Sequence, residues 1–318
     1  MTSMTKMERF RAAVTGQDVD RLPVSVWLHL GTEHLPGDAV ADRHVAYLKA
    51  YDFDYLKVMN DYRYPLPKGV ENVTTADDLR RFEPQPMSAY QFDQQLRCLR
   101  QLRRELPDVP LIETLFNPLQ TLARGAGSSA VQTVLNNPEA GDVALEAIAQ
   151  TLIAYVEAVK AAGIDGLFYS INGAVDPAHG GLTDEQFARF VTPYDRRILK
   201  AAEGMTRVAH VHGFNLRFDR CAGYPVEVFS WSHLNSAPSL GEARRLTQAA
   251  LMGGMNEVKL TRQSVGEVRA DIEASVRDAG WRKLLVGPGC TTAPDTPDRV
   301  LHAAVEVTRG LRLADYPA

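Results

Sequence analysis

The sequence predicts one (β/α)8 barrel, a TIM barrel, which covers residues 1–318 as a single domain and carries an extra N-terminal helix. Short apolar runs alternate with helical segments along the whole chain, and this pattern indicates a parallel sheet with helical crossovers. Eight such runs are present, and eight parallel strands close a barrel of this kind. No linker, composition break or internal repeat divides the chain.

The predicted elements begin with an amphipathic helix over residues 1–16. Each of the eight runs that follow is short and largely apolar, as expected for a strand that is buried in a parallel sheet. The predicted strands are 22–27, 54–59, 109–116, 166–171, 206–213, 228–232, 250–255 and 283–286.

Helical signals lie between these strands. Residues 143–162 place apolar side chains at helical spacing. A second helix is predicted over 184–203, where Thr183 starts a capping sequence. A third is predicted near the C-terminus, with Pro297 at its first position. Residues 65–86 are rich in proline and polar residues, and we expect a long loop there.

An open, doubly wound sheet is the competing architecture, since it also alternates strands with helices. Such sheets often carry a G-x-G-x-x-G turn directly after a strand, and none follows any predicted strand here. In a barrel, functional residues lie at the carboxyl ends of the strands. The residues at these ends are therefore the candidates for function.

The composition indicates a globular protein, with 45% hydrophobic and 23% charged residues and a formal net charge of −4. It offers no basic excess for nucleic acid or for an anionic membrane surface. The N-terminal residues lack the apolar region of a secretory signal, and no run is long enough to cross a bilayer. Three cysteines, an odd and sparse count, indicate a reducing compartment. We therefore expect a cytoplasmic protein.

The strongest chemical signal is the pair His210 and His212, at the end of the predicted strand 206–213. Residues i and i+2 of a strand point to the same face, so both imidazoles face one side. Cys290 follows the last predicted strand in a Gly-Pro-Gly turn, and a barrel brings such strand ends together at its mouth. Two imidazoles and a thiolate suit a zinc ion, with a fourth position left for water or substrate.

The same residues also have an ordinary structural explanation. A His-x-His pair is common, and a histidine can simply form hydrogen bonds within a packed site. A free cysteine is often a small buried hydrophobe. Cys98 lies in a predicted amphipathic helix, where we expect it to pack, whereas Cys221 is the substitute ligand if Cys290 does not bind metal.

Further polar side chains lie at the ends of predicted strands or within them. Asp61 can act as an acid or base, or it can form an Asx turn. Glu257 can be a fourth metal ligand or a base, and Tyr169 a proton donor. Glu113 lies within a predicted strand, where burial would require a partner or solvent access. The expected substrate-binding residues are Trp27, His29, Asn60, Tyr62, Ser170, Asn172, Asn215 and Asn256.

Four segments resemble the uroporphyrinogen decarboxylase superfamily. Residues 6–27 resemble its N-terminal helix, Gly-x-x-x-Asp-Arg-x-Pro turn and first strand. Residues 182–194 resemble its Leu-Ser-Pro-x-x-Phe…Pro-Tyr segment. Residues 210–215 (HVHGFN) resemble the His-x-Cys-Gly-Asn motif of its zinc methyltransferase branch. Residues 286–297 (VGPGCTTAPDTP) resemble the Pro-Gly-Cys…Pro-x-Thr-Pro ending of the same branch, and together the segments span nearly the whole chain.

The resemblance implies a barrel fold and a zinc ion bound by His210, His212 and Cys290. The branch has cysteine where His212 stands, and imidazole in place of thiolate removes one negative charge from the site. The zinc then becomes a better Lewis acid toward water and a weaker activator of a bound thiolate. Asp61 matches an aspartate of the decarboxylase itself. Residues 28–33 (LHLGTE), however, lack its Arg-Gln-Ala-Gly-Arg segment, so decarboxylation of the heme-pathway tetrapyrrole is not expected.

We predict a zinc-dependent methyltransferase that activates a thiol or hydroxyl of a small-molecule substrate, or that demethylates a small methoxylated compound. The resemblance implies methylcobalamin as donor. After Asp42-Arg43-His44, Tyr47 stands where a cobalamin-binding Asp-x-His-x-x-Gly motif has glycine, so a separate corrinoid protein would carry the donor.

Two other functions remain open for this sequence. The first is a metal-independent decarboxylase or lyase that uses Asp61 and Tyr169 for protonation. The second is a non-catalytic barrel that binds a ligand. The identity of the substrate and the oligomeric state are also open, and a homodimer is one state that the sequence allows.

Overall fold

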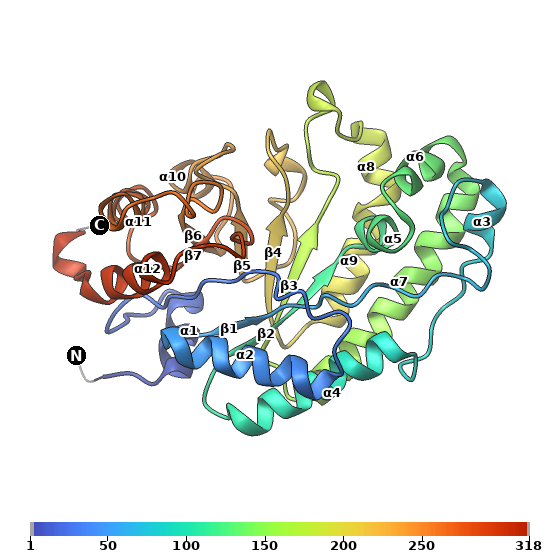
Figure 1. The fold of residues 1–318 in the computed structure, drawn as a ribbon. Helices are drawn as coiled ribbons and strands as arrows, with labels where there is room; N and C mark the ends of the chain where they lie inside the picture. Colours follow the sequence, from blue (N-terminus) through green and yellow to red (C-terminus); the bar gives the residue numbers. More distant parts are fainter. Residues whose placement is uncertain (1–2, 317–318) are drawn as a thin grey trace.

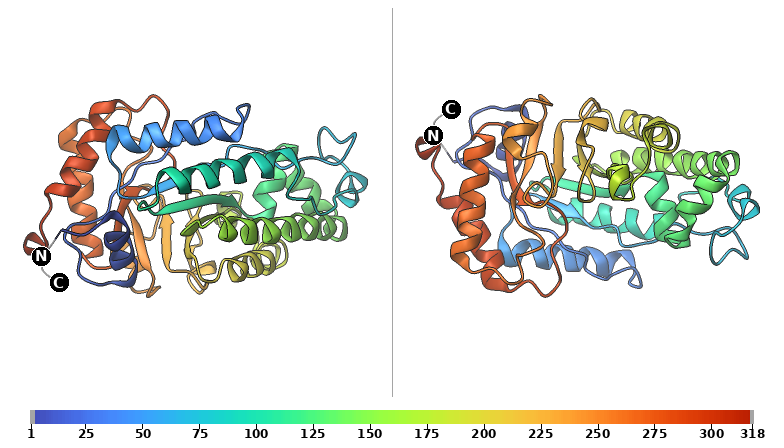
Figure 2. Two further views of the ribbon diagram at one scale, coloured as in Figure 1. Left: turned by 90° about the horizontal axis from the view of Figure 1, so that it is seen from below. Right: turned by 90° about the horizontal axis from the view of Figure 1, so that it is seen from above.

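A computed structural model describes residues 3–316 of the chain. At its centre lies a parallel sheet of seven strands, whose order in the sheet is their order in the chain (Figure 1). Helices lie around the outside of this sheet, as Figure 2 shows from below and from above. The predicted α/β class and sequential parallel order are thus confirmed. The strands are β1 (Leu56–Val58), β2 (Leu111–Phe116), β3 (Gly166–Ile171), β4 (Thr206–Val211), β5 (Val228–Trp231), β6 (Ala250–Met255) and β7 (Leu284–Pro288).

The predicted first strand, residues 22–27, is not a strand in the structure. This segment forms one isolated parallel bridge, between Val24 and Val286 of β7. On its other side, the N–H of Asp54 donates to the carbonyl of Val24 at 2.8 Å. A longer ladder is prevented because Pro23 has no N–H to donate and β1 is only three residues long. Seven described strands thus replace the predicted eight, and the segment links the two edges of the sheet.

The described residues form twelve α-helices and three short 3-10 turns. None of the helices in residues 3–316 is both long and apolar enough to cross a membrane. The helices are α1 (Lys6–Thr15), α2 (Gly37–Tyr51), α3 (Ala76–Arg80), α4 (Tyr90–Glu105), α5 (Pro118–Ala126), α6 (Ser129–Asn136), α7 (Pro138–Ala161), α8 (Asp184–Phe190), α9 (Thr192–Ala201), α10 (Leu240–Ala243), α11 (Val265–Ala279) and α12 (Asp298–Gly310).

Capping residues and prolines explain where several helices begin and end. Thr5 and Glu8 form a capping box at the start of α1, and Gly16 ends this helix in a left-handed conformation with φ of 80°. The predicted helix 184–203 is divided into α8 and α9. The division occurs because Pro193, in the first turn of α9, lacks the N–H that a continuous helix would need.

Three further predictions differ from the structure in detail. Helix α7 begins at Pro138, about one turn before the predicted start. Pro297 is the N-cap of α12 rather than its first residue. The predicted loop over residues 65–86 contains the short helix α3, which Thr75 caps.

A buried cluster of charges holds α1 and the approach to β1 together. The carboxylate of Asp54 is fully buried and accepts hydrogen bonds from Arg9 Nη1 at 2.9 Å and from Arg21 Nη1 at 2.6 Å. It also accepts the N–H of Val24 at 3.0 Å. Arg9 donates in addition to both oxygens of Asp20, each at 2.7 Å. Asp20 and Arg21, the Asp-Arg pair of the N-terminal turn, therefore have a structural role where the two edges of the sheet meet.

Candidate metal centre

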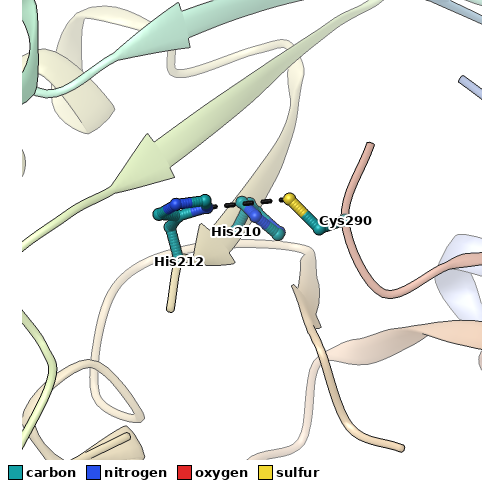
Figure 3. Close-up of side chains that lie close together, drawn as sticks. All are labelled: His210, His212 and Cys290. Carbon is teal, nitrogen blue, oxygen red and sulfur yellow. Dashed lines mark hydrogen bonds between the residues drawn. The ribbon is translucent and has the colours of Figure 1, made fainter. Parts of the chain in front are cut away.

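Two histidines from the end of β4 and a cysteine from the loop after β7 meet in space. His210 lies in β4 and His212 directly follows it, so strand alternation points both rings to the same side. Their possible ligand atoms and that of Cys290 all lie within 4.8 Å of one another. Cys290 Sγ is 3.6 Å from His212 Nδ1 (Figure 3). The three residues that the sequence singled out as metal ligands therefore converge in the structure.

Neighbouring strands fix the ring of His210. Ser170 of β3 and Ser230 of β5 are its register partners on either side. The ring of Phe168 stacks on that of His210, with centroids 5.1 Å apart and an interplanar angle of 29°. His210 Nδ1 lies 3.3 Å from Ser230 Oγ. These contacts set the plane of the imidazole before any metal binds.

Gly289 allows the loop that carries Cys290 to pack closely. A Cβ atom at Gly289 would lie 2.6 Å from Glu257 Oε2 and 2.7 Å from Ser232 Cα, which is too close for any side chain. Glu257 follows β6 and Ser232 follows β5. A glycine is therefore needed for the loop to pass over the ends of these strands and present the thiol to the histidines.

The cluster extends from a buried to an exposed end. His210 is buried, Cys290 is half-buried and His212 is exposed. Burial lowers the pKa of His210 despite the opposing effect of Cys290, and a lower pKa favours the neutral imidazole that binds metals. Burial alone would raise the pKa of the Cys290 thiol, but the charge and hydrogen bond of His210 lower it overall. A lowered pKa favours the thiolate, the form that ligates metals.

This donor set fits a zinc ion. Nitrogen and sulfur ligands at about 2.1–2.3 Å from a tetrahedral zinc are about 3.5 Å apart. That separation is close to the 3.6 Å between Cys290 Sγ and His212 Nδ1. Within residues 3–316, no fourth His, Cys, Asp or Glu joins the group, so the predicted fourth ligand Glu257 lies outside it. Three protein ligands leave one position open, as in catalytic zinc sites.

A cavity of about 340 Å³ lies beside the three ligands. Part of its wall is aromatic, and the rings of Trp27 and Phe168 meet edge to face with centroids 5.6 Å apart. A largely apolar wall with a few polar groups is typical of a small-molecule site. Besides the three ligands, the lining residues are Trp27, His29, Lys57, Met59, Thr114, Phe116, Phe168, Ser170 and Thr291.

Lys57 of β1 is a candidate functional residue that sequence reasoning missed. It is 4% exposed, and its Nζ lies 4.3 Å from the centroid of the Phe168 ring. Its hydrogen bond goes to Met59 Sδ, a weak acceptor, at 2.8 Å. Burial lowers the pKa of Lys57 to about 7, although Cys290 and two carboxylates act in the opposite direction. A lone lysine in the apolar run 54–59 is the signal that could have revealed it, because a buried charge needs a reason.

We expect Lys57→Met to raise the free energy of unfolding at pH 6 by at least about 1 kcal/mol, because it keeps the apolar stem and removes a buried ammonium. The pKa of Lys57 in the folded protein is about 7, below the ordinary value of 10.5. Stability of the wild type is therefore greatest above the ordinary pKa and falls as the pH drops through about 7. The variant should lack this dependence.

Urea unfolding followed by circular dichroism between pH 6 and pH 10 or so measures both effects of Lys57→Met. Parallel pH profiles for the two proteins, or a variant less stable than the wild type, would mean that the ammonium makes a stabilising contact.

Three other predicted residues, Trp27, His29 and Ser170, line the cavity. Asp61 is buried beside it, with Oδ1 2.6 Å from His29 Nδ1. Burial alone would raise the pKa of Asp61, but the hydrogen bond and charge of His29 hold it below its ordinary value. Asp61 therefore positions His29 at the cavity wall and does not line the cavity itself.

Tyr169 faces away from the cavity. Adjacent strand residues point to opposite faces, and Ser170 faces the cavity. The hydroxyl of Tyr169 donates to Asp195 Oδ1 on α9 at 2.7 Å, and both side chains are fully buried. Burial raises the pKa of Asp195 to about 7. The predicted role of Tyr169 in proton transfer does not fit this placement.

Glu113 contacts the helices outside the sheet. It is fully buried and accepts hydrogen bonds from Tyr155 Oη at 2.7 Å, Gln95 Nε2 at 3.0 Å and Asn60 Nδ2 at 3.1 Å. Burial raises the pKa of Glu113 to about 7. The sequence predicted that a buried Glu113 would need a partner or solvent access. The structure supplies partners, in the form of these three side chains.

The remaining predicted residues lie at different places. Asn60 and Tyr62 line a second cavity of about 460 Å³. Asn172 follows β3, and its Oδ1 accepts from Ser170 Oγ at 3.3 Å. Asn215 lies in an exposed turn with φ of 52°, which asparagine tolerates.

Asn256 and Glu257 form a polar network with Asn235 beside the loop of Cys290. Asn235 Nδ2 lies 3.2 Å from Asn256 Oδ1 and 3.3 Å from Glu257 Oε1. Burial raises the pKa of Glu257. Its contact with Gly289 indicates that this network supports the loop that carries Cys290.

Residues 59–311, more than half of the chain, match the family model described as uroporphyrinogen decarboxylase (URO-D). The chain belongs to this family. Membership agrees with the resemblance found in the four sequence segments. Among curated proteins, none matches the chain in sequence.

Solved structures resemble this member of the uroporphyrinogen decarboxylase family in fold. A methyltransferase from Methanosarcina mazei has a TM-score of 0.74 at 15% identity, over 96% of this chain and 98% of that chain. A B12-independent methionine synthase from Shewanella sp. W3-18-1 has a TM-score of 0.49 at 16% identity, over 67% and 66% of the two chains. A putative vitamin-B12-independent methionine synthase from Listeria monocytogenes has a TM-score of 0.48 at 14% identity, over 67% and 68%. At these identities, the first comparison establishes a shared fold.

Proposed function

We propose that this member of the uroporphyrinogen decarboxylase family is a zinc-dependent methyltransferase. The observation that carries the proposal is the convergence of ligand atoms from His210, His212 and Cys290 within 4.8 Å, at the wall of a cavity. The similarity in fold to a methyltransferase agrees with it. The substrate would present a thiol or a hydroxyl group to this site.

In this proposal, His210, His212 and Cys290 hold the zinc and leave one position for the substrate. A bound zinc would lower the pKa of a thiol or hydroxyl and hold the group as an anion. The rings of Trp27 and Phe168 form an apolar part of the cavity wall beside the reacting group. Lys57 lines the same cavity, where its ammonium form would favour a negatively charged substrate atom.

The methyl donor in this proposal is methylcobalamin carried by a separate corrinoid protein. His44, the histidine of the incomplete cobalamin motif, is buried, and its Nδ1 lies 2.9 Å from the carbonyl of Val40. Its Nε2 accepts the N–H of Met59 at 3.0 Å, so neither nitrogen is free to ligate a corrinoid. The exposed side of the cluster at His212 is where a donor would approach. In the opposite direction, the same site would demethylate a small methoxylated compound.

A metal-independent carboxy-lyase has less support. That reaction would require Asp61 and Tyr169 to act on one substrate. The hydroxyl of Tyr169 instead donates a hydrogen bond to Asp195 on α9, on the face of the sheet that the helices cover. The carboxylate of Asp61 is paired with His29. A non-catalytic binding barrel would need no metal, so metal analysis distinguishes it from the proposed enzyme.

Metal analysis combined with a transfer assay tests the proposed function. We expect about one zinc per purified chain and transfer of the methyl group from methylcobalamin to small thiols. A chelator should abolish transfer, and added zinc should restore it. His210→Ala should lose both zinc and transfer, whereas His179→Ala, at an exposed control position, should keep both.

Two outcomes would contradict this function. One is a zinc-free protein in which His210→Ala changes neither stability nor activity. The other is turnover of a carboxylate substrate that Asp61→Asn abolishes and metal removal leaves unchanged, which would favour the lyase.

A further inference from the structure

The second cavity, of about 460 Å³, lies directly beside the candidate metal centre. Thr114 and Phe116 of β2 line both cavities. The two cavities therefore share part of their lining at the end of β2, and one small molecule that occupied both would pass Phe116. A group bound in the second cavity would then be the end of the substrate that lies away from the metal ligands.

Two arginines supply the formal charge of the second cavity. Arg63 and Arg124 line it, and no aspartate or glutamate does within the described part of the chain. Arg124 lies on α5, and its Cζ is 4.0 Å from the centroid of the Phe116 ring. Stacking on this ring restrains the guanidinium at the boundary between the two cavities.

The guanidinium of Arg124 forms no ion pair with residues 3–316. The nearby carboxylates Asp61 and Glu33 act on it electrostatically, but Asp61 is paired with His29 at 2.6 Å and Glu33 is exposed. Arg63 donates from Nη1 to the carbonyl of Arg124 at 2.9 Å and likewise has no carboxylate partner there. Burial lowers the pKa of Arg124. A ligand that brings negative charge would relieve this unfavourable arrangement.

We propose that Arg124, assisted by Arg63, binds a carboxylate of the substrate whose thiol or hydroxyl lies at the metal centre. This inference rests on the proposed function. It narrows the substrate class to small carboxylic acids that also carry a thiol or a hydroxyl group. The planar fork of arginine matches a carboxylate with two parallel hydrogen bonds. The apolar ring of Phe116 would contact the aliphatic part of the molecule between its two polar ends.

Binding, rather than turnover, tests the carboxylate subsite. Calorimetric titration of the zinc-loaded chain should show about tenfold tighter binding of 3-mercaptopropionate than of 2-mercaptoethanol. Arg124→Gln should remove this preference and leave the affinity for 2-mercaptoethanol unchanged. Arg124→Lys keeps a charge without the fork and should retain part of the preference. Arg104→Gln, at an exposed position on α4, is the matched control and should retain all of it.

A second titration separates the subsite from the metal. The compound 3-(methylthio)propionate has the carboxylate but no thiol. The metal-free wild-type chain should bind it about tenfold more tightly than metal-free Arg124→Gln. If the chain binds no zinc, the proposed function fails while this titration still reports on Arg124. Equal binding of the acid and the neutral thiol by the wild type, or an acid preference that survives Arg124→Gln, would overturn the proposed subsite.

Discussion

Replacement of Cys290 by alanine should lower the zinc affinity of the chain at least about a hundredfold. Cys290 supplies the one sulfur in the group, and its loss leaves His210 and the exposed His212. The remaining site would have to hold a doubly charged cation with two neutral imidazoles and no anionic ligand. Competition with a chromophoric zinc chelator measures the affinity directly.

Cys221 provides the matched control for this experiment. It is fully buried, burial raises the pKa of its thiol well above the ordinary value, and it lies outside the metal group. Cys221→Ala should leave the zinc affinity unchanged and lower stability by about 1–2 kcal/mol through the small void it leaves. If folded Cys290→Ala retained the affinity of the wild type, the thiol would not be a ligand and the proposed site would be wrong.

The ligand set also bears on the reaction. The zinc methyltransferase branch that the sequence resembles has cysteine where this chain has His212. With one thiolate instead of two, the metal would carry more positive charge and bind an anionic substrate atom more strongly. The same charge would leave that atom less nucleophilic. Lys57 and Arg124 line the two cavities, and their positive charge agrees with the proposed anionic substrate.

Strand alternation accounts for both a success and a failure of sequence prediction at the site. His210 and His212 are two residues apart, so the pattern alone places both rings on one side, and the structure agrees. Tyr169 and Ser170 are adjacent, so at most one of them can face the cavity. Ser170 does, and Tyr169 bonds with Asp195 behind the sheet. A prediction that placed both in the site already conflicted with the geometry of a strand.

Lys57 and Arg124 escaped sequence prediction for a different physical reason. Lysine and arginine usually lie in solvent. The apolar run around Lys57 signals burial, but it does not show what the amine contacts, and the sequence around Arg124 carries no such signal. The position of Lys57 matters because the ring of Phe168, on a strand far along the chain, lies 4.3 Å from its amine. Arg124 matters because no carboxylate of the second cavity neutralises it. Both properties depend on tertiary packing, which sequence periodicity does not encode.

The predicted strands also show which properties the sequence encodes and which depend on tertiary packing. The predicted strands 166–171 and 250–255 coincide with β3 and β6, because each is an apolar run whose neighbours in the sheet are long enough to pair with it. Residues 22–27 are equally apolar but lie between two sheet edges, and Pro23 interrupts their hydrogen bonding. Local apolarity predicted burial correctly there, while the extent of pairing depended on the neighbours.

The buried charges at these sheet edges lead to the largest stability effect that we expect. Asp54→Asn should lower the free energy of unfolding by about 3–5 kcal/mol. The Asp54 carboxylate is fully buried and accepts hydrogen bonds from Arg9 and Arg21. Asparagine has nearly the same size, but it removes the negative charge that Arg21 pairs with and leaves Arg9 with Asp20 as its remaining carboxylate partner. Urea unfolding followed by circular dichroism measures the loss.

Asp52 offers a control two residues away. Its side chain is 61% exposed and pairs with Arg309 at 2.7 Å, and its φ of 53° suits asparagine. Asp52→Asn should therefore lower stability by less than about 1 kcal/mol, the usual value of a surface pair. Raising the salt concentration should shrink the effect at Asp52 and leave most of that at Asp54. If the two variants unfolded at the same urea concentration, the buried cluster would contribute no more than a surface ion pair, and the few hydrogen bonds of Val24 and Val286 would have to join the sheet edges without it.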